Sequence, residues 1–144
     1  MKTLFKIALL LTLILVTTSF AQTEVGKIFT DKEAATLFGG ITQEKEIPLG
    51  TFQKFLNESD NCFLVTLSNN QVYFASSGRT PIYPVNQKSY PVNYFKFSKS
   101  KVQELINLNP NGLSVKIQLR NNVLTIQNGE NVLELSLICP PYCF

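Results

Sequence analysis

The residues on which most enzyme chemistry depends are scarce in this chain. Its 144 residues include no histidine, which excludes a Ser-His-Asp triad, a Cys-His pair and an ordinary zinc site. The chain's only aspartates are Asp31 and Asp60, and no spacing of carboxylates indicates a glycosidase pair. No glycine-rich phosphate loop is present. We therefore predict no catalytic residue, no cofactor and no metal ligand.

Three cysteines remain as candidates for covalent chemistry. Cys139 and Cys143 flank Pro-Pro-Tyr and could close a small ring that pins the tail. Cys62 could instead pair with either tail cysteine, or all three thiols could stay reduced. Three cysteines in an exported chain leave at least one unpaired, so the connectivity stays open.

The segment 79–94 is the best candidate for a binding surface. It carries three tyrosines, three prolines and two basic residues, and long irregular connections in compact domains are often binding loops. Tyrosine and arginine are favoured as interface anchors. The alternative is an edge strand whose prolines block pairing between sheets. The predicted partner-binding residues are Arg79, Tyr83, Tyr90 and Tyr94.

Three lysines, Lys96, Lys99 and Lys101, surround the start of a predicted helix. The free N–H groups at a helix start favour anions, so an anion-binding site is conceivable there. The alternative is that these lysines are simply solvated.

Residues 1–21 have the pattern of a cleaved signal peptide. Lys2 and Lys6 precede an apolar run, and Ser19-Phe20-Ala21 suits a signal peptidase. We expect a single domain at 22–144 that is periplasmic or secreted, without stable membrane insertion. Removal of the two lysines leaves 11 basic and 10 acidic side chains, a net charge of +1, so nucleic acid is not an expected partner.

The elements that must position these residues begin with the stretch 113–138. Apolar and polar residues alternate with a period of two, which is typical of half-buried strands. Asn121-Asn122 forms a two-residue turn that sets Leu119 opposite Leu124. A second reversal follows, and the sequence predicts a three-stranded meander. Its apolar face would continue through Leu133, Leu135 and Leu137.

A second hairpin is predicted at 62–76, with its turn at Asn69-Asn70. Both of its faces are apolar, which favours a central place in a sheet. Helical spacing predicts helices within 24–40, over 50–57, and from Ser98 or Ser100 to about 108. The predicted fold is α+β: an antiparallel sheet of about five to seven strands, covered on one face by two or three short helices.

These features favour an exported, non-catalytic binding domain. Its expected partner is an unidentified protein or envelope polymer, as in an inhibitor-like or envelope-associated module. The runner-up is a carrier of small apolar or anionic ligands, with a pocket between helices and sheet bordered by Phe52, Phe55 and Tyr73. An enzyme without histidine is the third possibility.

Overall fold

The computed structural model of the chain describes residues 24–134 and 136–139. Within them the protein has an α+β fold with two antiparallel sheets of five strands each and three helices. The predicted fold class is therefore confirmed, with the strands divided between two sheets. The predicted signal peptide, residues 1–21, lies outside the described part.

The first sheet has the order β1-β9-β8-β7-β2. Its strands are β1 (Lys27–Thr30), β9 (Asn131–Glu134), β8 (Val123–Asn128), β7 (Ser114–Arg120) and β2 (Ile41–Pro48). The second sheet has the order β10-β6-β3-β4-β5. Its strands are β10 (Leu137–Cys139), β6 (Tyr94–Ser98), β3 (Cys62–Ser68), β4 (Gln71–Ala75) and β5 (Pro81–Tyr83). A single 3₁₀ turn, η1 (Ser77–Arg79), joins β4 to β5.

Both predicted Asn-Asn turns are confirmed. Asn121 and Asn122 have φ of +47° and +68°, and Leu119 lies opposite Leu124. Asn69 and Asn70 have φ of +51° and +61°. Positive φ at both central residues is what a type I′ turn requires, and asparagine tolerates it. The hairpin at 62–76 is central as predicted, because β3 pairs with both β4 and β6.

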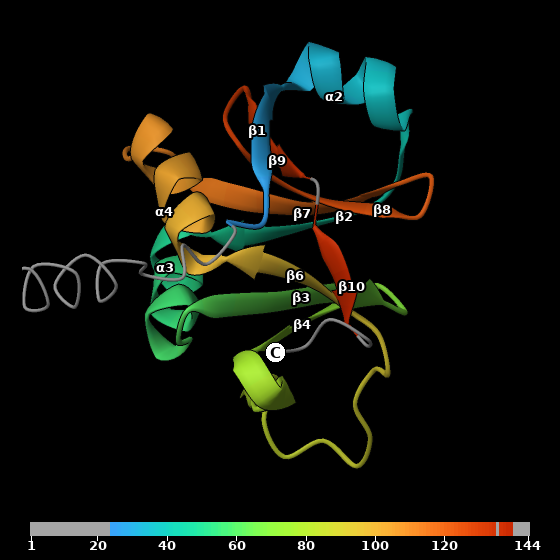
Figure 1. Cartoon of the computed structure of the whole chain (residues 1–144), viewed down its shortest axis with the longest axis vertical. Helices are drawn as coiled ribbons and strands as arrows, with labels where there is room; N and C mark the ends of the chain where they lie inside the picture. Colours follow the sequence, from blue (N-terminus) through green and yellow to red (C-terminus); the bar gives the residue numbers. More distant parts are fainter. Residues whose placement is uncertain (1–23, 135, 140–144) are drawn as a thin grey trace, which may run out of the picture.

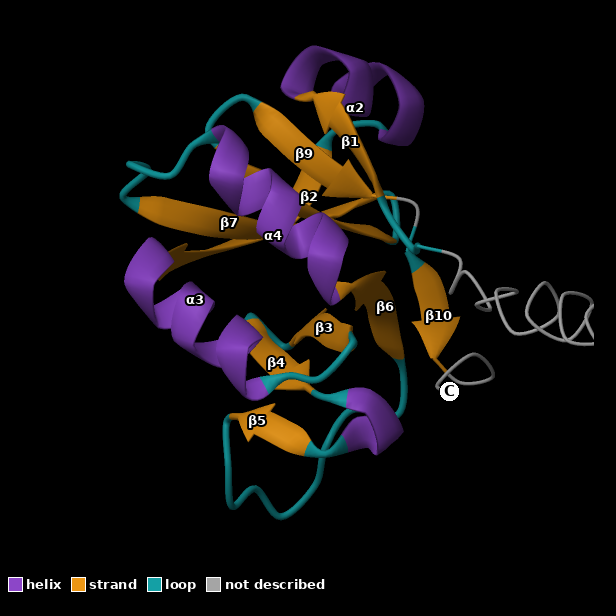
Figure 2. Cartoon of the chain, turned by 60° about the vertical axis from the view of Figure 1, so that its left-hand side comes forward, coloured by secondary structure: helices purple, strands orange, loops and turns teal. Residues whose placement is uncertain are grey.

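One hydrophobic core joins the two sheets and is closed by two helices, α3 (Leu49–Glu58) and α4 (Lys99–Leu108). Figure 2 shows these helices lying side by side across the strands. Phe52 and Leu56 of α3 are fully buried, as their spacing of four residues along a helix predicts. The core side chains from the strands include Phe63, Val65, Ile117, Ile126 and Leu133. These two helices are too short to be stable alone, so the shared core must hold them.

The first predicted helix is shorter and lies elsewhere than expected. Only α2 (Asp31–Phe38) is helical, and the residues before it form β1, which pairs with β9. Thr30 and Glu33 complete a capping box that fixes the helix start. Ala34 is its only buried residue, so α2 has too little apolar surface to close the core. It lies on the outer face of the first sheet instead (Figure 1).

The predicted meander over 113–138 ends early. β7 and β8 pair in the expected register and β9 pairs with β8 as the third strand. β10 leaves that sheet and pairs with β6 of the second, with Leu137 opposite Lys96. Alternation sets the face on which a side chain lies, and it does not choose the partner strand. Leu137 is therefore exposed rather than in the core. Leu135 lies outside the described residues.

Candidate functional site

A surface cleft of about 540 Å³ opens where the two sheets diverge. On one side it is bounded by β2 and the start of α3, and on the other by the β3–β4 turn and by β5. Its lining residues are Lys45, Glu46, Ile47, Pro48, Thr51, Phe55, Asn69, Asn70, Gln71, Val72 and Tyr83. The volume lies within the range of about 300–1,000 Å³ typical of ligand sites.

Aromatic rings supply much of the apolar part of the cleft. The rings of Phe55 and Tyr83 stack with centroids 4.9 Å apart, and Phe55 also packs 5.3 Å from Phe74. Phe55 lies on α3 one turn after the buried Phe52, so α3 points one ring into the core and the next toward the cleft. Tyr83 is held there because β5 pairs with β4. It is 43% exposed, so a ligand has access to it.

The rim of the cleft is polar and includes an edge of β2 that pairs with no strand in the described part of the chain. Lys45 and Glu46 are consecutive in β2, so they point to opposite faces of the sheet. Both line the cleft, which must therefore run along the edge of the strand. The other edge of β2 pairs with β7. Asn69, Asn70 and Gln71 face this edge from the opposite wall.

Arg79 and Tyr94, both predicted to bind a partner, make close contacts within the fold. Nη2 of Arg79 donates to the carbonyl oxygen of Pro91 at 3.0 Å and to that of Val92. The guanidinium also lies 5.7 Å from the centre of the Tyr94 ring. Tyr94 is only 2% exposed, and this burial raises its pKa. These contacts close the connection between β5 and β6 against the second sheet.

The four predicted partner-binding residues do not form one surface. Arg79, Tyr90 and Tyr94 line a shallow hollow of about 310 Å³ together with Pro91 and Val92. Tyr83 belongs to the larger cleft. Their role in binding remains a prediction, but only Tyr83 is placed beside a well-formed concavity.

The three lysines of the predicted anion site also have separate roles. Lys99 donates from Nζ to the carbonyl oxygen of Ser59 at 2.6 Å, which caps the end of α3. Lys101 pairs with Glu104 at 2.8 Å and with Glu24 at 3.3 Å. Lys96 is buried within β6.

The start of α4 already has an anion of its own. The carboxylate of Glu24 accepts a hydrogen bond of 2.7 Å from Ser100. This bond and the neighbouring Lys101 lower the pKa of Glu24. A bound anion would have to compete with this carboxylate.

The predicted cysteine pairing lies outside the described side chains, since those of Cys139 and Cys143 are not described. Cys62 is a free, buried thiol. The alternative that pairs Cys62 with the tail is therefore not formed in this structure. Phe52 and Tyr73, which were expected to border a ligand pocket with Phe55, do not line the cleft. Phe52 is buried, and Tyr73 packs in a small cluster on the outer face of the second sheet.

No protein-family model, curated protein or solved structure matches this chain significantly. Functional residues are therefore not transferred from any relative. In the part of the chain that the structure describes, no helix is both long and apolar enough to cross a membrane.

Sequence reasoning missed the part of the site that β2 contributes. The run Gln43-Glu44-Lys45-Glu46 is recognisably charged and extended, and such a run is a signal of an exposed edge strand. It does not reveal what lies across from that edge. Lys45 meets the β3–β4 turn only because the two sheets are folded over one core.

Proposed function

We propose that this protein is an exported, non-catalytic binding domain that holds part of a macromolecular partner in the cleft between β2 and β5. The partner is a protein or an envelope polymer, as expected for an inhibitor-like or envelope-associated module. The observation that carries the proposal is the half-exposed Tyr83 ring stacked on Phe55 beside a free strand edge. Aromatic anchors with a polar surround are the usual composition of an interface centre.

The connection between β5 and β6 has a supporting part in this proposal. Arg79, which lies just before β5, donates to the carbonyl oxygen of Pro91 and lies over the Tyr94 ring. These contacts tie the start of β5, which carries Tyr83, to the far end of the connection. A preorganised anchor loses less conformational entropy on binding than a mobile one. Arg79 is thus a positioning residue, and Tyr83 is the contact residue.

Alanine substitutions separate these roles. The immobilised protein is incubated with the native envelope fraction, and the amount of retained partner is measured. Tyr83→Ala should reduce this amount by tenfold or more, as expected for an interface anchor. Tyr90→Ala, a matched tyrosine outside the cleft, should leave capture unchanged. Thr51→Trp, which fills the cleft from the first turn of α3, should also abolish capture. Equal capture by wild type, Tyr83→Ala and Thr51→Trp would refute the proposal.

The cleft volume also suits the runner-up function, a carrier of small apolar or anionic ligands. A small organic molecule that co-purifies with the wild type and is displaced by Thr51→Trp, with no partner retained, would favour that function instead.

A further inference from the structure

The strand β2 has the features of a docking edge. It is eight residues long, lies last in its sheet, and is exposed from Ile41 to Glu46. Among the described residues, only β7 pairs with it. An edge strand presents unpaired N–H and C=O groups that can pair with another extended segment. The cleft runs along this edge, so there is room for such a segment beside Lys45 and Glu46.

The charges of β2 alternate between its two faces. Glu44 lies opposite Gln118 and Glu46 opposite Lys116 in β7, so both carboxylates are on the outer face. Lys45 lies opposite the core residue Ile117, and residues that face each other across strands share a face. The outer face of the edge is thus acidic, and its inner face has one basic residue followed by the apolar Ile47.

This arrangement opposes pairing with a second copy of the chain. Suppose that the β2 strands of two copies paired in antiparallel fashion and extended the sheet. Each residue would then lie opposite a residue whose side chain projects to the same side of the sheet. Registers that pair the two charged runs bring like charges together, because they place Glu44 against Glu44, or Glu44 against Glu46 with Lys45 against Lys45. Like charges directly opposite each other are destabilising. The charged run thus disfavours pairing with itself, whereas the backbone groups of the edge stay open to a different strand.

We propose that the cleft binds an extended segment of a different protein, which adds to the first sheet as a strand beside β2. This inference rests on the proposed function and names the partner's chemistry. The segment carries basic side chains toward Glu44 and Glu46, an acidic one toward Lys45, and an apolar one toward Ile47 and Phe55. Main-chain hydrogen bonds to the edge give affinity, and the alternating side chains give specificity.

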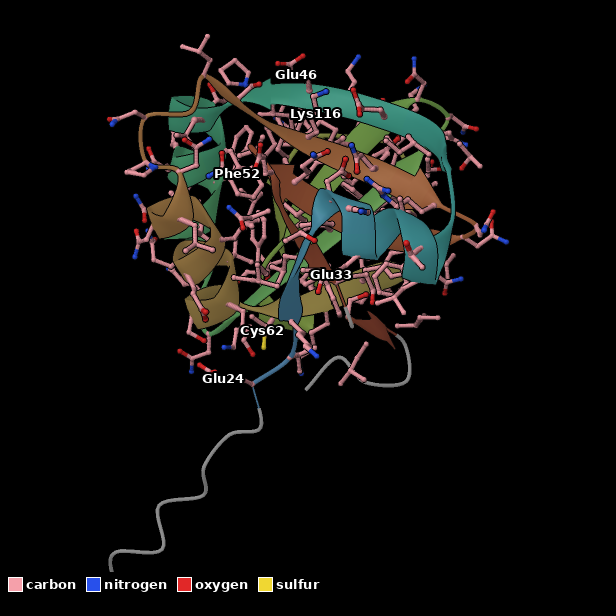
Figure 3. The ribbon with its side chains drawn as sticks, turned by 90° about the horizontal axis from the view of Figure 1, so that it is seen from above. Glu24, Glu33, Glu46, Phe52, Cys62 and Lys116 are labelled. Carbon is pink, nitrogen blue, oxygen red and sulfur yellow. The ribbon has the colours of Figure 1, made fainter. Side chains whose placement is uncertain are left out.

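Both carboxylates of the acidic face already have partners, and that of Glu44 accepts a hydrogen bond of 2.8 Å from Gln118. Glu44 pairs with Lys116 at 3.3 Å across the sheet, and Glu46 accepts a hydrogen bond from Ser114. Figure 3 shows Glu46 and Lys116 close together on the side of the molecule opposite Glu24. The outermost row, which an added strand would meet first, contains both carboxylates. Lys116 supplies one positive charge for the two carboxylates, and a basic segment would supply the second.

A set of capped synthetic peptides tests this inference on the full chain. The sequence Thr-Val-Lys-Glu-Lys-Thr carries the complementary pattern for an antiparallel strand. Its charge-reversed form is Thr-Val-Glu-Lys-Glu-Thr, and a third peptide is the first one N-methylated at alternate residues. The complementary peptide should bind at least tenfold more tightly than the reversed one at low ionic strength, and the preference should shrink with salt. N-methylation should abolish binding, because it removes the backbone donors.

Charge variants of β2 make the test specific to this edge. Glu46→Lys should reduce the preference for the complementary peptide by severalfold or invert it. Lys45→Glu, which leaves the outer-face contacts intact, should shift preference toward Thr-Val-Lys-Lys-Lys-Thr. Amide-shift changes should centre on residues 43–47, and sedimentation of the free wild type should give a monomer.

Three results would overturn the inference: equal affinity for the two charge patterns, equal binding of the N-methylated peptide, or a wild-type dimer that Glu46→Lys disrupts. The first two, found together with a loss of native partner capture in Tyr83→Ala, would leave the proposed function standing. If the peptide preference is absent and Tyr83→Ala also leaves partner capture unchanged, both the strand-addition inference and the proposed function are refuted.

Discussion

Asp60 joins the end of α3 to the turn that precedes the tyrosine- and proline-rich connection. Its carboxylate accepts hydrogen bonds from the backbone N–H groups of Cys62 and Ser77, both at 3.2 Å, and from the Ser77 hydroxyl. Partial burial disfavours the charged carboxylate, but these hydrogen bonds outweigh it and lower its pKa from 3.8 to about 2. One carboxylate thus ties η1 to the start of β3.

Replacing Asp60 should lower stability in a pH-dependent way. Because its folded-state pKa is below its unfolded value, the ionised carboxylate stabilises the fold above pH 4, and this contribution is lost as the pH falls toward about 2. Asp60→Asn should reduce the free energy of unfolding by about 1 kcal/mol at neutral pH, a value discounted for solvent screening. Urea unfolding measured between neutral pH and the acid limit checks this.

The matched control is Glu58→Gln, two residues away on the exposed end of α3. It should change the free energy of unfolding by less than about 0.5 kcal/mol at any pH. A pH-independent loss in Asp60→Asn, or an equal loss in both variants, would contradict the assigned role.

Residue identity predicted turns well and exposure poorly. Asn-Asn pairs between apolar runs specify a turn because few other residues accept two successive positive φ angles. Tyr83 and Tyr94 are the same residue type in the same predicted segment, yet one is half exposed and the other buried. Their difference comes from distant residues, since Tyr94 meets Arg79 while Tyr83 meets Phe55 on α3. The local sequence does not predict which distant residues will contact each tyrosine.

At the scale of elements, α2 is held to the first sheet by a partly buried ion pair. Arg120 is only 2% exposed and donates to Oδ1 of Asp31 at 2.6 Å and to Oε1 of Gln118. The side chain of Asp31 is half exposed. Asp31 begins α2, so this ion pair joins the start of the helix to the end of β7. Alternation correctly placed Arg120 away from the core, but it gave no indication that α2 would cover it.

A double-mutant cycle measures this contact. Asp31→Ala should lower the free energy of unfolding by about 2 kcal/mol, because it leaves the buried Arg120 guanidinium without its counter-charge. Arg120→Met combined with Asp31→Ala should cost less than the sum of the single changes, with a coupling of about 1 kcal/mol or more. Denaturant unfolding of the four proteins gives the value.

The exposed pair of Lys101 and Glu104 on α4 provides the comparison cycle. Its coupling should stay below about 0.5 kcal/mol, as for other exposed pairs one turn apart. Equal coupling energies in the two cycles would show that the Arg120–Asp31 pair is screened by solvent as strongly as an exposed pair.

The division into two sheets is the main element-scale feature that the sequence did not specify. The strands β3, β4, β7, β8 and β9, the two Asn-Asn turns and the helices α3 and α4 follow from periodicity and from turn chemistry, whereas β1 falls in a segment predicted to be helical. The pairing of β1 with β9 and of β10 with β6 joins segments far apart in the chain. Such pairings depend on which edges remain open after the local hairpins form, and alternation carries no such information.

At the scale of the whole molecule, the cleft is a consequence of folding two sheets over one core. Residues of β3, β4, β7 and β8 share that core, while β2 and β5 lie at the edges where the sheets separate. The floor of the cleft thus continues the core through Phe55 and Val72. This apolar floor lies beside the outer edge of β2.

Site-specific photo-cross-linking tests this account most directly. A photoreactive phenylalanine analogue is placed at residue 83 in the cleft or at residue 92, a position that is 68% exposed outside it. In the native envelope, we expect a discrete protein adduct from residue 83 that disappears in a Thr51→Trp background, and none from residue 92. An adduct from residue 92 alone, or one from residue 83 that survives filling of the cleft, would contradict the claim that the cleft is the binding site.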